Sequence, residues 1–431
     1  MKKKKLNIAI VGLGNIGSYL YKYLEKNKNI IAKKTNVEPV IMYVSAKNKL
    51  KKRNVKIPKN KWVKNYLDVT TDKNIDLIVE LIGGSEGPAK KLVFQALKNK
   101  KNVVTANKAL LAKYGDELAK IAEKNKVNLE FEAAVCGGVP VVRTLKEGLI
   151  SNSISKIYGV LNGTSNYILT LMDKKNIDFE SALKKAQSLG YAESNPTSDL
   201  NGDDVSSKLK ILTALCFNSY INKININVEG IHDIDQTDII NANNFGYKIK
   251  LLGVSELVNK KVTQRVHPCL IKKSSYIANI SGVLNAVIIE GSPVGQTVIQ
   301  GEGAGPEATT SALVSDISSI LRGNIKFPFA LSDKERKHIK YDNILNKNFS
   351  NYLRLDVQDK HGVLSDITNI MAKNKVSIKR LVQNPIKSKK YSSIIIITHK
   401  AKDLFLKKAI KQLSLKSYLI KKPKLIRIEE I

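Results

Sequence analysis

The sequence predicts an α/β protein whose N-terminal part is a parallel β-sheet flanked by helices. Two observations support this prediction. The apolar run 6–11 leads directly into a glycine-rich turn, and strand-like apolar runs alternate with helical patterns over residues 6–131. Such alternation is typical of crossover connections between parallel strands. The chain has 431 residues, which is long enough for about three domains, so further domains are expected beyond this sheet.

The first strand and the turn after it carry the most specific pattern of this region. Residues 6–11 predict a buried strand, and the helix after the turn is expected to run through about Glu25. A GxGxxG pattern is a weak signal alone, but between a buried strand and a helix it is the context that a dinucleotide-binding, Rossmann-type turn requires. The helix N-terminus would face the pyrophosphate; a glycine-rich turn without a ligand is the alternative. The residues expected to hold the dinucleotide are Gly12, Leu13, Gly14, Asn15, Ile16 and Gly17.

The second strand bears on the choice of dinucleotide. It is expected at 40–44 and is followed by Ser45, with no acidic residue where an NAD site places one for the ribose hydroxyls. Lys47 and Lys49 could instead meet a 2′-phosphate. The sequence therefore favours NADP, although Ser45 would also tolerate NAD. Further strands of this sheet are expected at 75–80, 101–105 and 127–131.

A later segment rich in acidic residues, 190–208, is the strongest catalytic candidate. Asp204 and Lys208 lie four positions apart on a helix expected to begin near Asp203, so their side chains share one face. Burial lowers the pKa of a lysine and a neighbouring carboxylate counters that effect, which suits Lys208 to proton transfer. An ordinary surface ion pair at helical spacing is the alternative. The buried stripe of this helix would be Val205, Leu209, Leu212 and Cys216.

Composition narrows the possible partners. The formal net charge is +34, but the lysines are spread along the chain and aromatic residues make up only 6% of it. We therefore predict no nucleic-acid partner and expect the charge to attract anionic cofactors and substrates. No apolar run approaches the ~18 residues of a membrane span, so no membrane association is expected. The scattered cysteines Cys136, Cys216 and Cys269 form no disulfide framework and favour a reducing, cytoplasmic location.

The second half of the chain predicts a mixed sheet and a small C-terminal domain. Gly305 and Pro306 are expected to open a helix through Leu321, because proline suits the first helical position. A segment rich in lysine and asparagine, 325–348, has the composition of a linker. The remainder fits a βαββαβ order. The expected elements are strands at 262–269 and 286–290, then a strand from 352, a helix to 373, strands at 376–382 and 392–398, a helix at 403–413 and a strand ending near 428.

The segment ending at Lys208 resembles the signature of the homoserine dehydrogenase family. The resemblance covers 6–322, and 352–364 resembles the first strand and loop of an ACT regulatory domain, with His361 where that family often has proline. The implied domains are an NAD(P)-binding Rossmann domain (1–137, completed by the helix 305–322), an α+β catalytic and dimerisation domain (138–304), a linker (325–348) and a ferredoxin-like ACT domain (350–431). The signature positions in register are Ala186, Gly190, Pro196, Asp199, Gly202, Asp204 and Lys208.

This resemblance implies a monofunctional enzyme, with no aspartate kinase segment before the strand at residue 6. The implied reaction is NAD(P)H-dependent reduction of L-aspartate 4-semialdehyde to L-homoserine, on the route to threonine, methionine and isoleucine. Lys208 is the expected proton donor. Glu193 and Asp204 would hold the substrate amino group and orient Lys208, and Asp199 would position a water or the helix start. The remaining cofactor residues implied are Thr105, Lys108, Gly190 and Gly305.

The glycine- and proline-containing turn 132–140 is a candidate cation site, because carbonyl oxygens outside regular pairing suit a hard cation. The resemblance assigns Na⁺ or a similar monovalent cation to Glu132, Val135, Gly137 and Val139. An interdomain turn without metal is the alternative.

The resemblance also implies a homodimer or homotetramer and a separable ACT domain with threonine as its effector. The alternative is a tail that only stabilises the oligomer. Another ACT-tailed amino-acid dehydrogenase, such as a prephenate or phosphoglycerate enzyme, would need a catalytic histidine, and His232 and His267 lie in no such motif. A catalytically inactive regulator or a basic nucleic-acid binder would be marked by loss of Lys208 or by clustered basic residues, and the sequence has neither feature.

Overall fold

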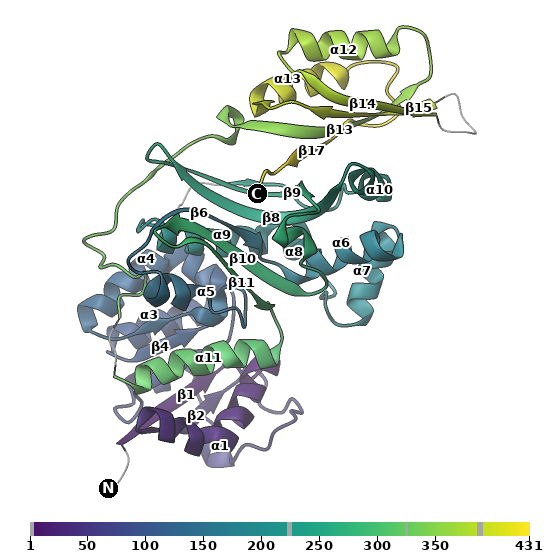
Figure 1. Cartoon of the computed structure of the whole chain (residues 1–431). Helices are drawn as coiled ribbons and strands as arrows, with labels where there is room; N and C mark the ends of the chain where they lie inside the picture. The colour runs from purple at the N-terminus through teal and green to yellow at the C-terminus, as the bar shows by residue number, and fades with distance from the viewer. Residues whose placement is uncertain (1–3, 222–225, 324–325, 386–390) are drawn as a thin grey trace.

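The computed structural model describes residues 4–221, 226–323, 326–385 and 391–431. Its N-terminal part is a five-stranded sheet of purely parallel pairs, in the order β2-β1-β3-β4-β5 (Figure 1). This confirms the predicted Rossmann-like sheet. The strands are β1 (Lys4–Val11), β2 (Val37–Ser45), β3 (Leu77–Glu80), β4 (Asn102–Thr105) and β5 (Leu129–Glu130).

Helices cover both faces of this sheet. One of them comes from far along the chain: α11 (Pro306–Leu321) packs against α1 (Asn15–Thr35), and both contribute to one apolar core. Helix α1 continues past the predicted end at Glu25, because Ile31 and Ala32 are buried and Asn36 closes the helix in the left-handed conformation. The other helices of this region are α2 (Asp68–Thr71), α3 (Pro88–Lys98) and α4 (Lys108–Asn125), with a 3₁₀ turn at Lys59–Lys61.

The middle of the chain forms one half of a second, mixed sheet. Its helices α6 (Gly163–Lys175) and α9 (Asp203–Cys216) pack on β8 (Tyr247–Val258). Helix α9 begins at the predicted residue, and its predicted apolar stripe is buried. The other strands are β6 (Ser153–Val160), β7 (Asn227–Val228), β9 (Lys261–Lys272), β10 (Leu284–Ser292), β11 (Gly295–Glu302) and β12 (Lys340–Tyr341). The other helices are α5 (Val141–Arg143), which runs into a π-helical turn at Thr144–Gly148, α7 (Phe179–Ser188), α8 (Thr197–Asn201) and α10 (Gln236–Asn244), with 3₁₀ turns at Glu132–Ala134 and Tyr276–Asn279.

The C-terminal part has the predicted βαββαβ order of an ACT domain. Its elements are β13 (Asn348–Gln358), α12 (Val363–Lys373), β14 (Ile378–Pro385), β15 (Tyr391–Thr398), the short β16 (Ala401–Lys402), α13 (Asp403–Leu413) and β17 (Lys424–Ile428). A 3₁₀ turn at Ile344–Asn346 precedes them. None of the helices in the described parts of the chain is both long and apolar enough to cross a bilayer.

The C-terminal sheet is continuous with the central one. Strand β17 leaves the ACT domain and lies beside β9 (Figure 1), where Arg427 pairs in parallel with Cys269 and Ile428 with Leu270. The resulting sheet has the order β11-β10-β6-β8-β9-β17-β13-β15-β14 among the described strands. The sequence did not predict this junction, because it joins strands more than a hundred residues apart.

Candidate active site

A cavity of about 620 Å³ lies between the nucleotide-binding region and the central sheet. Its walls come from the starts of α1 and α4, the turn after β5, the loop before α6, the segment after α7, helix α9 and the start of α11. The fold thus gathers segments from the whole length of residues 16–309 around one space. The predicted site residues that line it are Ile16, Lys108, Gly137, Gly190, Glu193, Asp199, Asp204, Lys208 and Gly305.

In this cavity the buried carboxylate of Asp204 forms ion pairs with two lysines. Lys208 Nζ is 2.7 Å from Asp204 Oδ2, and Lys108 Nζ is 2.8 Å from Asp204 Oδ1. Lys208 also donates to the carbonyl oxygen of Leu161 at 2.7 Å. Asp204 and Lys208 are 4% and 7% exposed, so the pair is not a surface ion pair.

Asn162 holds the carboxylates in place, and the sequence reasoning missed this role. Its Oδ1 accepts the Ser165 N–H as the N-cap of α6, which fixes the orientation of the amide. The amide Nδ2 therefore points to the acids and donates to Asp199 Oδ1 at 2.8 Å and Asp204 Oδ2 at 2.9 Å. An asparagine before a Gly-Thr helix start was the available signal, since such a cap leaves the amide donor free for other groups.

The two members of the pair stabilise each other's charged form. Burial alone would raise the pKa of Asp204, but Lys208 and Lys108 outweigh it and hold that pKa well below its ordinary value. Burial alone would lower the pKa of Lys208, but the Asp204 carboxylate outweighs it and the net pKa is raised. Lys208 therefore remains an ammonium group near neutral pH. Burial raises the pKa of the neighbouring Cys136 thiol to about 11, so that thiol stays protonated.

The glycine turn is shaped partly by packing and partly by open space. A Cβ on Gly12 would lie 2.4 Å from the Leu81 carbonyl, and one on Gly17 would lie 2.0 Å from the Gly12 oxygen. A Cβ on Gly14 would meet nothing within 4 Å. Packing therefore requires glycine at 12 and 17, whereas at 14 the open space fits the close approach of a pyrophosphate to the start of α1.

A second cavity, of about 490 Å³, continues from this turn and is lined by Leu13, Gly14 and Asn15. The basic residues that line it are Lys22, Lys51, Lys52 and Arg53. Arg53 donates to the Leu13 carbonyl and to three carbonyls of residues 48–51, which holds that loop beside the turn. Neither Lys47 nor Lys49, the lysines that the sequence suggested could meet a 2′-phosphate, lines this cavity, and Lys49 donates to the Val63 carbonyl.

Thr105 and Glu132 have their polar atoms engaged within the protein. The buried Thr105 hydroxyl donates to Glu80 Oε2 at 2.6 Å and accepts the Asn107 N–H, and it lines neither cavity. The Glu132 carboxylate accepts the N–H groups of Val142 and Arg143 at 2.8 and 2.7 Å. Burial raises the pKa of Glu132 to about 7.

The turn at 132–139 offers a cation little besides backbone oxygens. In the described residues, no group of three or more His, Cys, Asp or Glu side chains is arranged to hold a metal ion. Gly137 lines the catalytic cavity with φ +52, and a Cβ there would lie 2.5 Å from the Gly303 oxygen.

Neither histidine named in the alternative lies in the catalytic cavity. His267 is buried in β9 with its Nε2 2.9 Å from Glu429, and the His232 Nε2 lies 2.7 Å from Asn201 Oδ1. The catalytic cavity thus places the buried ammonium group of Lys208 in the same space as Ile16, at the start of α1 in the glycine turn. The fold and the site thus define the class of NAD(P)-dependent oxidoreductases.

Comparison with known proteins gives the family. Residues 12–132 match "Homoserine dehydrogenase, NAD binding domain", residues 140–318 match "Homoserine dehydrogenase" and residues 351–414 match "ACT domain". The homoserine dehydrogenase of Neisseria gonorrhoeae is 38% identical, with 99% of each chain covered, and that of Helicobacter pylori is 37% identical. The chain belongs to the homoserine dehydrogenase family.

Solved structures agree with this assignment. A homoserine dehydrogenase from Thiobacillus denitrificans superposes with a TM-score of 0.92 at 37% identity, covering 99% of this chain and 98% of that chain. The S. aureus enzyme covers 99% of this chain with a TM-score of 0.76 at 34% identity. The similarity therefore includes the nucleotide-binding, catalytic and ACT regions together.

Proposed function

We propose that this enzyme reduces L-aspartate 4-semialdehyde to L-homoserine, with Lys208 as the proton donor, in the biosynthesis of threonine, methionine and isoleucine. The observation that carries the proposal is the position of Lys208: its ammonium group lines the cavity and is held by Asp204 and the Leu161 carbonyl. A bound NAD(P)H supplies hydride to a carbonyl carbon, and negative charge then develops on the carbonyl oxygen. A fixed ammonium group stabilises that charge and donates the proton.

Asp204 and Asn162 act as positioning residues in this scheme. Both oxygens of Asp204 are already engaged by lysines, so its main role is to fix Lys208 and Lys108 rather than to hold the substrate amino group. Glu193 lines the cavity from an exposed position and suits the substrate ammonium group better. Asp199 is held by Asn162 at the same wall and supports that subsite.

For the cofactor, we propose NADP in preference to NAD, with the adenosine end over the second cavity. Gly14 and the start of α1 would receive the pyrophosphate, and Lys51 and Lys52 would face a 2′-phosphate. Neither lysine forms an ion pair within the described chain, so both charges are available to an anion. Gly190 and Gly305 would contribute backbone at the catalytic end, where both line the cavity.

Three further proposals rest on the family resemblance and the geometry together. A monovalent cation at Glu132, Val135, Gly137 and Val139 would depend on backbone oxygens, since the Glu132 carboxylate is engaged. A homodimer or homotetramer is expected. Threonine is proposed as the ACT effector, since the ACT match covers residues 351–414; added threonine should lower turnover of the full chain, and an unchanged rate would contradict this.

Replacing Lys208 tests the catalytic proposal. Lys208→Ala should lower kcat by roughly 10²–10⁴-fold, the usual contribution of a general acid, while leaving the NADPH Kd nearly unchanged. The matched control is Lys210→Ala, which removes a half-buried lysine from the same helix outside the cavity. Steady-state assays with the semialdehyde and fluorescence titration with NADPH give the two quantities. A loss of less than about tenfold in kcat for Lys208→Ala would remove the proton-donor role.

A further inference from the structure

A third cavity, of about 200 Å³, lies at the junction of the central sheet and the ACT domain. We call it the seam cavity, and define it by Lys156, Glu256, Arg265, Lys347, Lys400 and Glu429 among its lining residues. None of these six residues lines the catalytic cavity. The established dehydrogenase chemistry therefore does not account for it.

The floor of the seam cavity is built by three neighbouring strands. Lys156 of β6 lies opposite Glu256 of β8, and Glu256 lies opposite Thr263 of β9. Arg265 is two positions further along β9 and so projects from the same face. Three adjacent strands thus present charged side chains toward one space.

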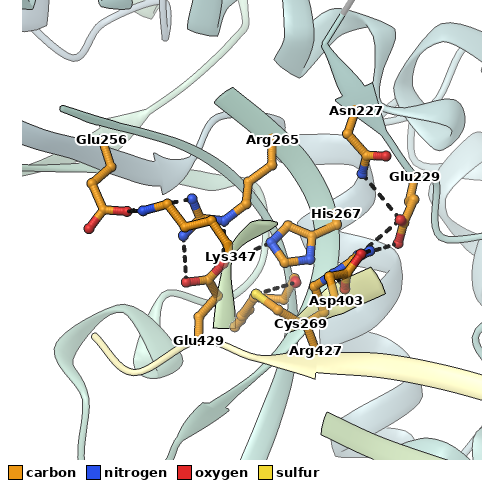
Figure 2. Close-up of polar contacts among 11 residues, drawn as sticks. Asn227, Glu229, Glu256, Arg265, His267, Cys269, Lys347, Asp403, Arg427 and Glu429 are labelled. Carbon is orange, nitrogen blue, oxygen red and sulfur yellow. Dashed lines mark hydrogen bonds and ion pairs between the residues drawn. The ribbon is translucent and has the colours of Figure 1, made fainter. Parts of the chain in front are cut away.

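The other wall comes from the ACT side of the junction. Figure 2 shows Lys347 reaching Glu256 and the Glu429 carboxylate lying between Arg265 and His267. Arg265 Nε and Nη2 donate to the two oxygens of Glu429 at 2.6 and 2.8 Å. At the rim, Lys400 pairs with Glu430 at 2.5 Å. The cavity exists only when the end of the chain is seated against β9.

After these pairs are formed, two positively charged donors of the seam cavity still lack a hydrogen-bond partner among the described residues. Arg265 Nη1 is buried and has no hydrogen-bond partner, and the carboxylate oxygen of Glu256 is 3.9 Å from it. Lys156 forms no ion pair in the described part of the chain, and its ammonium group lies 4.9 Å from the Tyr158 ring centroid. A buried guanidinium N–H without a partner is rare in folded proteins, and an unseen ion or water is its usual explanation.

We propose that the seam cavity binds a small oxyanion, a carboxylate or a phosphate, through Arg265 Nη1 and the Lys156 ammonium group. The lining has more positive than negative side chains, since Lys156, Arg265, Lys347 and Lys400 face Glu256, Glu429 and Glu430. A volume of about 200 Å³ admits a small molecule and excludes a dinucleotide. Because the walls come from both sides of the junction, the bound anion stabilises the seating of the ACT domain.

Thermal unfolding of the full chain tests this site. Melting would be followed in sodium acetate, sodium phosphate and sodium chloride at equal ionic strength and pH, with saturating NADP⁺ so that the nucleotide site is filled. Acetate or phosphate should raise the melting temperature of the wild type by about 2 °C over chloride. Lys156→Gln should abolish this difference. Lys272→Gln, which replaces an exposed lysine on β9 outside the cavity, should retain it.

Saturation-transfer NMR from the protein to the acetate methyl group gives a second readout that does not depend on stability. The signal should be present in the wild type and reduced in Arg265→Lys, which keeps the charge beside Glu429 and removes Nη1. A response to phosphate alone identifies the phosphate class. Two results would overturn the proposal. The first is equal melting in all three salts together with no transfer to acetate, and the second is an anion effect that persists unchanged in Lys156→Gln. In either case water is the partner of Arg265 Nη1.

Discussion

The two sheets of this enzyme are assembled in opposite ways. The nucleotide-binding sheet takes all its strands from residues 4–130, and each pair is parallel. The second sheet combines strands from 153 to 428, and its continuity depends on two parallel residue pairs between β17 and β9. The first sheet is specified by local pattern, whereas the second depends on partners that are distant along the chain.

The two regions also differ in how many buried ion pairs hold them together. The junction around β17 is held by buried ion pairs: Arg265 with Glu429, Arg427 with Asp403, and Arg354 with Asp238 near α10. A buried charge is tolerated only with its partner present, so these pairs fix the register of the junction but make it sensitive to single changes. The nucleotide turn depends instead on the absence of side chains at glycines.

The glycine turn provides the most drastic test of this contrast. Gly17→Ala should prevent correct folding of the nucleotide-binding region, because its Cβ would lie 2.0 Å from a backbone oxygen. Gly14→Ala is the matched control: it should fold with nearly unchanged melting and lose NADPH affinity, since its methyl group fills open space at the turn. Circular dichroism and NADPH titration distinguish the two. Equal melting of both variants would show that packing does not determine position 17.

Removing the C-terminal region tests whether the second sheet is one unit. The sequence predicts a separable tail, but Tyr352, Ile426 and Ile428 belong to the same apolar core as the central domain. A chain ending after Asn348 would expose that surface and the edge of β9, so we expect lower thermal stability and aggregation. Light scattering and melting curves measure both. A monodisperse truncated protein with unchanged melting would establish separability.

A single substitution tests the buried charges at the junction. Glu429→Gln should destabilise the protein by about 3–5 kcal/mol, because Arg265 and His267 lose their anion. Glu430→Gln is the control, since its side chain is 48% exposed. Urea unfolding gives the free-energy difference. A value under about 1 kcal/mol would place the pair among weak surface interactions.

The same pair predicts a pH dependence. Burial alone would raise the pKa of Glu429, but Arg265 and His267 outweigh it and hold the pKa well below its ordinary 4.5. The stabilisation is therefore complete above about pH 4.5 and is lost progressively as the pH falls further. Acid unfolding of Glu429→Gln should lack this component, and identical acid profiles for variant and wild type would contradict the assignment.

The smallest expected effect concerns cofactor choice. Lys52→Ala should weaken NADPH binding by roughly tenfold, with little change for NADH, since it removes one charge facing a 2′-phosphate. Lys47→Ala, which lies outside the cavity, is the control. The ratio of kcat/KM for the two cofactors is the measurement. A wild type that prefers NADH would reject the proposed preference.

Local patterns made much of this structure predictable. The strand–glycine–helix order of residues 6–17, the face shared by Asp204 and Lys208, and the start of α11 at Pro306 each depend on neighbours within a few residues. The order of strands and helices in the ACT domain was predictable for the same reason.

Features that depend on tertiary contacts were not predictable. The extension of α1 to Thr35 depends on burial against the sheet, and the role of Asn162 depends on acids about 40 residues away. The loop after β2 folds back toward the turn and brings Lys51, Lys52 and Arg53 to the second cavity, an arrangement that the sequence did not indicate. Neither the sequence of β17 nor that of β9 contains a pattern that indicates their pairing.

The contact between Arg265 and Glu429 also constrains how the nascent chain can fold. The two residues are 164 positions apart, so at typical synthesis rates Arg265 is made roughly 10–30 s before its partner. During that interval β7 can already pair with Arg265 and Val266 of β9, but Cys269 and Leu270 still lack β17, whereas β1 to β5 have all been synthesised. We therefore expect the ribosome-bound chain to have all strands of the parallel sheet and a central sheet that still lacks β17. The unpaired backbone of β9 at Cys269 and Leu270 is where we expect a chaperone to bind.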